Sequence, residues 1–392
     1  MATLTFPEIK QISDVLPAIA GRSEFSVGDG SRYFDVVDYH IMDSHTFKDD
    51  DPDIAAIRRE CRGLLFHKDG RIARRGFHKF FNIGETDETF PDNIDLSTGY
   101  HLLEKLDGSM IAPFISETLG SIYWASMRGS YPYHERLAGL FNGTAYARLV
   151  EALAEKNATA IFEFCSPENR VVVEYTEPQM TLLAVRDLYS GRYYDRDEIE
   201  SLATEFDIPL VQPLEHKAVS AAALISELAS LKNMEGAVLW MDGRPHAKFK
   251  GEWYLQLHKL LGYFKFEKDI ARLVLSGNSD DLMGILNAPK REALIAYRDT
   301  LLDGVKHVAK QCSTMAADVT HKKIERKVFA VDYDAPQVMK GFLFRYYDRF
   351  DQAQFLDDVI AKGIAMTTSF SEWDQFKSSV GLELTWQVED LD

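Results

Sequence analysis

The sequence predicts an α+β protein whose C-terminal third is entirely helical. Up to about residue 262, short runs of β-forming residues alternate with amphipathic helical segments. Beyond that point strand patterns nearly vanish, and apolar residues recur at the three- to four-residue spacing of helices. Since 392 residues give room for two domains, we expect one domain over 1–262 and a second over 263–392.

The composition is that of a water-soluble globular protein. Hydrophobic residues make up 46% of the chain and charged residues 27%. No apolar run approaches the ~20 residues that a membrane span needs, and the N-terminus lacks the features of a signal peptide. Three widely spaced cysteines form neither a zinc pattern nor a disulfide framework. We therefore expect a cytoplasmic protein without a membrane partner.

The net charge of −17 argues against a protein that coats nucleic acid broadly. It leaves room for a local basic groove, because only the surface that faces phosphates needs Lys and Arg.

The first hundred residues predict a helix over 7–20, a strand over 33–42, a short helix over 54–59 and a strand over 60–66. The extended segment that follows, 77–82, puts Lys79 and Phe81 on one face. The pairing puts a cation and an aromatic ring side by side. The alternative is that Phe80 and Phe81 both belong to the core and Lys79 to the surface.

Lys105 ends the next predicted strand, 100–105, just before the turn signal Asp107-Gly108. The glycine of such a turn lets the backbone approach a ligand closely. A lysine held there can act as a nucleophile, provided that its amine is kept neutral by desolvation or by neighbouring cations. The alternative is a hairpin with a solvated lysine.

Strands over 110–115 and 121–127 and a helix over 135–153 lead to a strand over 159–165 that contains Glu163. A carboxylate between Phe162 and Phe164 is costly unless it meets a cation, a metal or hydrogen-bond donors. The alternative is an edge strand with Glu163 in water.

After a strand over 180–187 and helices over 197–205 and 220–230, a hairpin joins strands 235–240 and 246–250. Glu235 stands at the mouth of the first strand. Lys248 and Lys250 share one face of the second, where their like charges repel unless an anion lies between them. An exposed edge pair that protects against aggregation is the alternative.

The C-terminal domain is predicted to contain helices at 270–275, 282–286, 294–308, 338–350 and 355–362. Between the third and fourth of these, residues 321–327 form a basic cluster in an otherwise acidic chain. A solvated helix face would explain it. The functional hypothesis is that the cluster reads the shape and backbone of a folded RNA. Its proposed RNA-binding residues are Lys322, Lys323, Arg326 and Lys327.

Five elements occur in a fixed order: Lys105-x-Asp-Gly, Arg128-Gly, Phe-Glu163-Phe, Glu235-Gly and Lys248-x-Lys250. This series resembles the covalent nucleotidyltransferase superfamily of ATP-dependent ligases and mRNA capping enzymes. The flanking segments at 62–63, 79–82 and 250–254 look like the phage RNA ligase 1 family, which repairs cleaved tRNA. The similarity covers about residues 33–260.

The resemblance implies a nucleotidyltransferase domain of ATP-grasp-like antiparallel sheets with helices, followed by a helical domain for RNA or tRNA recognition. DNA ligases and capping enzymes instead continue into a β-rich OB barrel.

The resemblance also implies an ATP-dependent RNA ligase, in which Lys105 takes AMP from ATP. The AMP passes to the 5′-phosphate of an RNA, and a 3′-hydroxyl then seals the ends. Lys248 and Lys250 would supply positive charge around the phosphates. Mg²⁺, or Mn²⁺ in its place, would be held by Glu163, Glu235 and Asp280.

The remaining roles implied by the resemblance concern the nucleotide. Arg62 and Lys79 would contact phosphates or ribose, and Phe81 would stack on adenine. Tyr39, Gly108, Arg128 and Tyr254 complete the expected nucleotide site, with an arginine at 128 where the family usually has lysine.

Two alternatives remain: an mRNA-capping type of guanylyltransferase and a non-catalytic RNA-binding relative. The expected partner is RNA with 5′-phosphate and 3′-hydroxyl ends, such as cleaved tRNA, together with a separate end-healing kinase/phosphatase. If the protein is phage-encoded, its compartment is the host cytoplasm.

Overall fold

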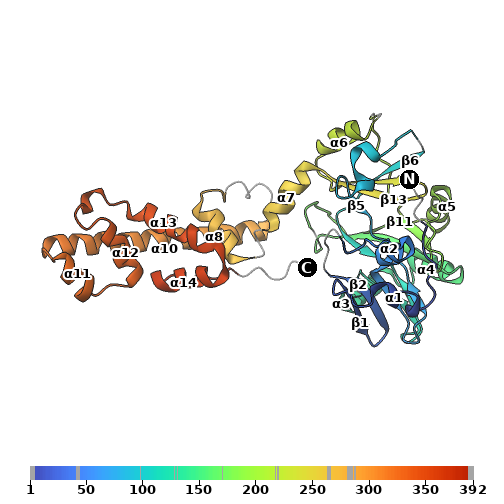
Figure 1. Cartoon of the computed structure of the whole chain (residues 1–392), viewed down its shortest axis with the longest axis horizontal. Helices are drawn as coiled ribbons and strands as arrows, with labels where there is room; N and C mark the ends of the chain where they lie inside the picture. The colour runs from blue at the N-terminus through green and yellow to red at the C-terminus, as the bar shows by residue number, and fades with distance from the viewer. Residues whose placement is uncertain are drawn as a thin grey trace. The chain divides into compact units, whose positions relative to one another are not determined.

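The computed structural model describes residues 5–40, 45–97, 99–127, 129, 131–169, 171–216, 218, 220–262, 266–279, 286 and 288–386. The chain divides into two compact units, Met1–Leu255 and Gln256–Asp392 (Figure 1). The division falls inside helix α7 (Glu252–Gly262). The domain boundary expected from the sequence, after residue 262, lies at the end of this helix.

The first unit is built from four small sheets (Figure 1). All strand pairs are antiparallel except β5 with β13. The first sheet contains, in order, β1 (Phe25–Ser31), β2 (Phe34–Tyr39), β3 (Arg62–Phe66) and β4 (Ile72–Arg74), and the second contains β11 (Gln179–Asp187), β10 (Ala158–Cys165) and β7 (Ser109–Ile111). The third contains β5 (Phe81–Asn82), β13 (Arg244–Lys250), β12 (Gly236–Met241) and β6 (Tyr100–Lys105). The fourth is the pair of β8 (Phe114–Ser116) and β9 (Ser121–Tyr123).

The turn after Lys105 passes the chain from one sheet to another. Strand β6, which ends at Lys105, pairs with β12, whereas β7, which begins at Ser109, pairs with β10. The alternative of a simple hairpin is therefore wrong. The turn lies where two sheets diverge, and side chains from both can meet there.

Helices cover the outer faces of these sheets. A cluster of buried apolar residues joins α4 and α5 to β10 and β11, and another joins α6 to the sheet of β12 and β13. The helices of this unit are α1 (Leu16–Ile19), α2 (Pro52–Glu60), α3 (Tyr131–Phe141), α4 (Ala145–Glu155), α5 (Arg196–Phe206) and α6 (Ala221–Ala229).

Two helix predictions in this unit were wrong. The helix expected over 7–20 is only a 3-10 turn (Ile12–Asp14) and the four-residue α1, because Pro17 has no amide to donate in a longer helix. The helix expected over 135–153 is two helices, α3 and α4. Gly143 separates them with φ +73°, a conformation that glycine adopts at little cost.

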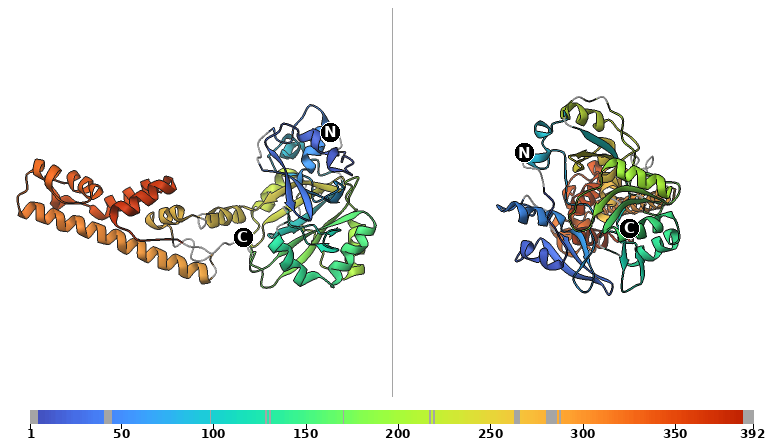
Figure 2. Two further views of the ribbon diagram at one scale, coloured as in Figure 1. Left: turned by 90° about the horizontal axis from the view of Figure 1, so that it is seen from below. Right: turned by 90° about the vertical axis from the view of Figure 1, so that its right-hand side faces the viewer.

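In the second unit the described residues form helices and no strand. The longest helix, α10, runs through the whole unit (orange in Figure 2), and the others pack against it around one apolar core. The helices are α8 (Glu267–Leu275), α10 (Ala288–His321), α11 (Arg326–Asp332), α12 (Gln337–Arg345), α13 (Phe355–Ala365) and α14 (Phe370–Val380). The mixed first unit and helical second unit confirm the predicted fold class.

Among the described residues, no helix combines the length and apolar character that crossing a bilayer requires.

Candidate active site

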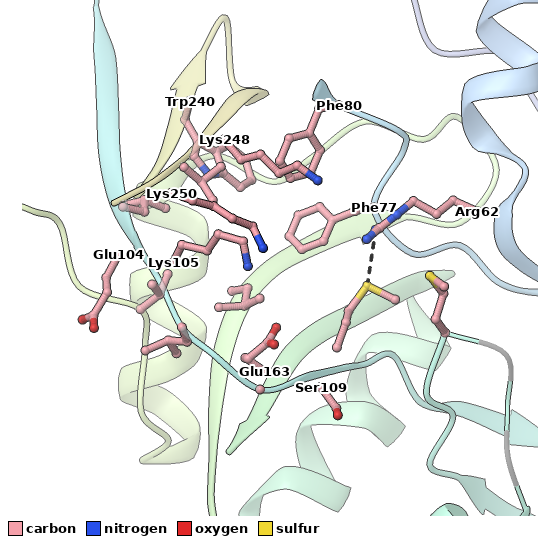
Figure 3. A pocket seen from close by; sticks show the side chains of 18 of the residues that line it. Arg62, Phe77, Phe80, Glu104, Lys105, Ser109, Glu163, Trp240, Lys248 and Lys250 are labelled. Carbon is pink, nitrogen blue, oxygen red and sulfur yellow. Dashed lines mark hydrogen bonds between the residues drawn. The ribbon is translucent and has the colours of Figure 1, made fainter. Parts of the chain in front are cut away.

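A cavity of about 600 Å³ opens in the first unit beside the turn that follows Lys105 (Figure 3). This volume lies within the range of small-molecule sites. The lining combines cations, two carboxylates and a large apolar surface: Tyr39, Arg62, Phe77, Phe80, Leu103, Glu104, Lys105, Leu106, Gly108, Ser109, Met110, Ser126, Met127, Glu163, Leu183, Val211, Val238, Trp240, Lys248 and Lys250.

One carboxylate holds two of the lysines. The Lys105 ammonium donates to Glu235 Oε2 at 2.6 Å, and Lys250 Nζ lies 2.9 Å from Glu235 Oε1. The strand register explains why both lysines reach the same carboxylate, because Lys105 and Lys250 both lie opposite Gly236, the residue next to Glu235. The Glu235 side chain is only 4% exposed, so this carboxylate is desolvated and paired by both oxygens.

Glu163 points into the cavity below the lysine ammonium groups (Figure 3). Its strand, β10, lies between β11 and β7, so the alternative of an edge strand is wrong. Burial raises the pKa of the Glu163 carboxyl to about 7, a shift that Lys105 opposes and Glu235 increases. The backbone amide of Gly108 donates to this carboxylate. Glu163 is thus poised between its neutral and charged forms near neutral pH.

Lys248 and Lys250 extend from the same face of β13 into the cavity. Burial, with smaller contributions from the nearby charges of Lys79 and Arg62, lowers the pKa of Lys248 to about 8. The cavity lining brings Arg62, Lys105, Lys248 and Lys250 together, and such a group of cations is suited to an anion such as a phosphate chain.

Gly108 is required by close packing of the turn against β10. A Cβ atom at this position would collide with the carbonyl oxygen of Phe164 and with Cys165 Sγ. Only glycine lets the turn come near enough for its amide to reach Glu163.

Asp107 and Tyr254 support the turn from behind. The Tyr254 hydroxyl donates to Asp107 Oδ1 at 2.7 Å, while the amides of Val172 and Val173 donate to Oδ2 at 2.7 Å each. Tyr254 is 2% exposed and does not line the cavity. Lys250 Nζ lies 5.0 Å from its ring centroid, a cation–π contact through which Tyr254 bears on the site.

Besides Tyr254, two other expected nucleotide residues, Lys79 and Phe81, lie outside the cavity lining. The Phe81 ring is buried in the core beside Phe47, and Lys79 Nζ lies 4.9 Å from the Phe81 ring centroid. The aromatic surface comes instead from Phe77, Phe80 and Trp240. Since successive side chains of an extended segment face opposite ways, Phe81 turns inward as Phe80 turns to the cavity, a choice the sequence left open.

Of the other expected residues, Tyr39 and Arg62 line the cavity, whereas Arg128 and Asp280 lie outside the described residues. The sequence reading missed Phe77, Phe80, Glu104 and Trp240. Trp240 and Val238 lie two residues apart on one strand. Because side chains alternate between the two faces of a strand, the sequence could have placed both on the face that lines the cavity.

The basic cluster lies in the second unit, at the end of α10 and the start of α11. Lys322, Lys323, Arg326 and Lys327 are all exposed. Lys322 pairs with Asp318 at 2.8 Å and Arg326 with Asp348 at 3.3 Å, both at the surface.

The carboxylates of the cavity fit a hydrated Mg²⁺ better than a fully protein-bound metal. No group of three or more metal-binding side chains occurs among the described residues. Mg²⁺ commonly takes one or two carboxylates, with water and phosphate as its other ligands. Glu163 fits this role, because its carboxylate enters the cavity, whereas each Glu235 oxygen lies against an ammonium group.

Comparison with known proteins shows which proteins this chain is similar to. The RNA ligase family matches residues 60–254. RNA ligase 1 of bacteriophage TS2126 is 30% identical over 243 residues, which are 58% of this chain and 58% of that protein. An RNA ligase of Rhodothermus phage RM378 is 24% identical over 360 residues, covering 75% of this chain and 80% of that protein.

Likeness to solved structures is weaker. An archaeal ATP-dependent RNA ligase gives a TM-score of 0.42 at 13% identity and covers 76% of this chain and 79% of that chain. An RNA ligase of Naegleria gruberi, solved with pyrophosphate, gives 0.37 at 16% identity over 47% of this chain and 58% of that chain.

Proposed function

The chain belongs to the phage RNA ligase 1 family, and on that premise we propose that it joins RNA ends with ATP through a covalent intermediate on Lys105. One observation carries the proposal: Lys105 lies at the end of a strand, in a cavity where Lys248, Lys250 and Glu163 also meet. A lysine among phosphate-binding groups has the position that a nucleophile for phosphoryl transfer needs.

In the first step, the Lys105 amine attacks the α-phosphorus of ATP. The ammonium group first gives one proton to Glu235 Oε2, which lies 2.6 Å from Nζ, and so becomes the attacking amine. A P–N bond then forms, the bond to pyrophosphate breaks, and the nitrogen releases its second proton to solvent or to the departing pyrophosphate. Lys248 and Lys250 stabilise the charge that develops on the phosphates and the leaving pyrophosphate.

The base of the nucleotide would lie in the apolar part of the cavity. Phe77, Phe80 and Trp240 offer rings there, and an aromatic face suits any purine. Arg62 and Tyr39 are close enough to this part of the lining to contact ribose or phosphates. Lys79 does not line the cavity and acts indirectly, because its positive charge lowers the pKa of Lys248.

A divalent metal, Mg²⁺ or Mn²⁺, would neutralise phosphate charge when bound. Glu163 would hold it, directly or through water.

In the second step, the 5′-phosphate of an RNA attacks the lysine-bound AMP, and Lys105 leaves. In the third, a 3′-hydroxyl attacks the activated 5′-phosphate, and AMP leaves as the phosphodiester forms. Both steps can use the same cations, because each stabilises charge at an adjacent phosphate.

The physiological part of the proposal is tRNA repair. The basic cluster of the second unit would contact the backbone of a folded RNA such as a cleaved tRNA. A separate kinase/phosphatase would supply the 5′-phosphate and 3′-hydroxyl ends in the same cytoplasm, that of the host if the protein is phage-encoded.

A sealing assay tests this proposal against its two alternatives. A 5′-labelled RNA with both required ends is incubated with the protein, Mg²⁺ and ATP, and we expect the label to become resistant to phosphatase. Transfer of GMP to the protein from GTP would favour a capping enzyme. RNA binding without either reaction would favour a non-catalytic relative.

A further inference from the structure

The segment that follows β10 folds back beneath the turn after Lys105. It contacts this turn in three ways: the amides of Val172 and Val173 donate to Asp107, the Tyr175 hydroxyl accepts from the Asp107 amide, and Asn169 reaches Ser109. Asn169 is 9% exposed and does not line the cavity. Sequence reasoning gave it no role.

The side chain of Asn169 is surrounded by partners. Its Nδ2 lies 2.9 Å from the Phe164 carbonyl oxygen, 3.2 Å from the Tyr133 hydroxyl and 3.4 Å from Ser109 Oγ. Its Oδ1 accepts from the amide of Ser166 at 2.6 Å and from the Ser166 hydroxyl at 2.9 Å. An amide buried with this many partners is held in one orientation.

These contacts lie at the end of a very short ladder. Strand β7 spans only Ser109–Ile111, and its pairs with β10 are Ser109 with Phe164, Met110 with Glu163, and Ile111 with Phe162. A slip of one residue would turn every side chain of the slipped strand to the other face. Three pairs alone give such a ladder little protection against a slip.

Asn169 bridges the two strands where that ladder ends, since Phe164 and Ser109 are register partners and both contact its Nδ2. Ser109 and Glu163 lie next to each other at the floor of the cavity (Figure 3). Fixing the first pair of the ladder therefore fixes the second, to which Glu163 belongs.

We infer that Asn169 is a positioning residue that fixes the β7–β10 register and so holds Glu163 against the Lys105 turn. The inference rests on the proposed function, because it assigns Asn169 a part in the transfer of AMP to Lys105. Asn169 touches no group of the cavity lining except Ser109, so its loss should slow the reaction without weakening ATP binding.

The test is the single-turnover rate of labelling of the full chain with α-labelled ATP and Mg²⁺, measured over a range of ATP concentrations. Asn169→Ala removes all contacts of the amide. Asn169→Asp keeps the acceptor for Ser166 and removes the donor to Phe164, with almost no change of volume. For both we expect a maximal rate lower by about a hundredfold, the scale of a 1 Å misplacement, and an unchanged half-saturating ATP concentration.

Asn142→Ala is the matched control. Asn142 Oδ1 accepts from Trp124 Nε1 at 2.8 Å, and neither residue lines the cavity. This variant loses an asparagine hydrogen bond in the same unit, and we expect it to keep the wild-type rate.

The result that would overturn the inference is an Asn169→Asp variant that labels as fast as Asn142→Ala at equal thermal stability. A half-saturating ATP concentration that rises while the maximal rate stays constant would also overturn it. A wild-type protein that takes no label would instead refute the proposed function, and the inference with it.

Discussion

Glu235 partly neutralises the lysines of the cavity, because it forms ion pairs with two of them. Its two oxygens hold Lys105 and Lys250, so the lysine proposed as nucleophile is fixed by a carboxylate before any nucleotide arrives. When Lys105 carries AMP, its nitrogen is no longer an ammonium group, and Glu235 Oε2 loses that partner. The same carboxylate can then serve a different group in the later steps.

Two titrating residues predict a pH optimum for labelling. The raised pKa of Glu163, about 7, means that its carboxyl becomes charged as the pH rises through that value. The lowered pKa of Lys248, about 8, means that its ammonium loses its proton above that value. Both are charged together between about 7 and 8, so kcat/KM for labelling should be highest there.

The measurement is the labelling rate at subsaturating ATP from pH 5.5 to 9, since this rate reports the free enzyme. Glu163→Gln should lose the rise on the acid side. A wild-type rate that is flat from pH 6 to 7.5 would contradict the assignment of Glu163.

Gly108→Ala should abolish labelling, because the added Cβ would push the turn away from β10 and from Glu163. We expect a loss of about a hundredfold or more in rate. Gly139→Ala in α3 is the control, since no atom lies within 4 Å of a Cβ placed there. Alanine in a helix interior should stabilise the protein slightly, by about 0.5–1 kcal/mol. If Gly108→Ala were labelled at the wild-type rate, the close packing of the turn against β10 would not be needed for labelling.

At the scale of elements, a buried ion-pair cluster ties α2 to β11 and to the chain after β4. Glu60 Oε1 lies 2.6 Å from Arg186 Nη2, and Glu60 Oε2 lies 3.1 Å from Arg75 Nε. All three side chains are at most 1% exposed. Burial by itself would raise the pKa of Glu60, but Arg186 and Arg75 outweigh it and lower this pKa to about 2.

Glu60→Gln should destabilise the first unit by about 3–5 kcal/mol, because two arginines would keep their charge in the core without a carboxylate. The contribution of Glu60 is complete above the pKa of an unfolded glutamate, about 4.5. It is lost as the pH falls from there towards 2. Urea unfolding at pH 7 and pH 3.5 measures both effects.

Glu117→Gln is the matched control for this prediction. Glu117 pairs with Arg71 at 2.7 Å, but the two side chains are 58% and 49% exposed. Exposed pairs contribute about 1 kcal/mol or less. Equal effects of the two substitutions would contradict the importance given to burial.

Elements could be predicted from the sequence where the signal is local. The strand that ends at Lys105, the strand around Glu163 and the hairpin that carries Lys248 and Lys250 lie as predicted, because alternation and turn residues specify them. Which strands share a sheet depends on contacts between distant segments. The separation of β6 from β7 therefore could not be read from the Asp107-Gly108 turn.

The same limit applies to the candidate site. Charged residues in apolar strands stand out in a sequence, which is why Glu163 could be selected. An aromatic residue does not show whether it faces a core or a cavity, so Phe81 was chosen where Phe80 lines the wall. Asn169 gave no signal, since its importance comes from partners in three separate segments.

At the scale of the whole molecule, the proposed chemistry and the proposed RNA recognition belong to different units. Replacing Lys322, Lys323 and Lys327 by Gln should weaken sealing of a nicked tRNA and leave self-labelling unchanged. Each lost phosphate contact should reduce the slope of log affinity against log salt by about one.

Three other exposed lysines of the same unit, Lys306, Lys310 and Lys362, provide the control when replaced by Gln. They change the charge equally and leave the cluster intact. If sealing of tRNA and of a short oligonucleotide fell by the same factor in the cluster variant, the cluster would not be a tRNA-recognition surface.

The central claim is that Lys105 carries AMP. The most direct measurement incubates the protein, after treatment with pyrophosphate, with α-labelled ATP and Mg²⁺, and maps the labelled peptide beside a Lys105→Ala variant. The account predicts acid-labile label on the peptide that contains Lys105, from ATP and not from GTP, and none on the variant. Label that persists in Lys105→Ala, or its absence from the wild type, would contradict the account.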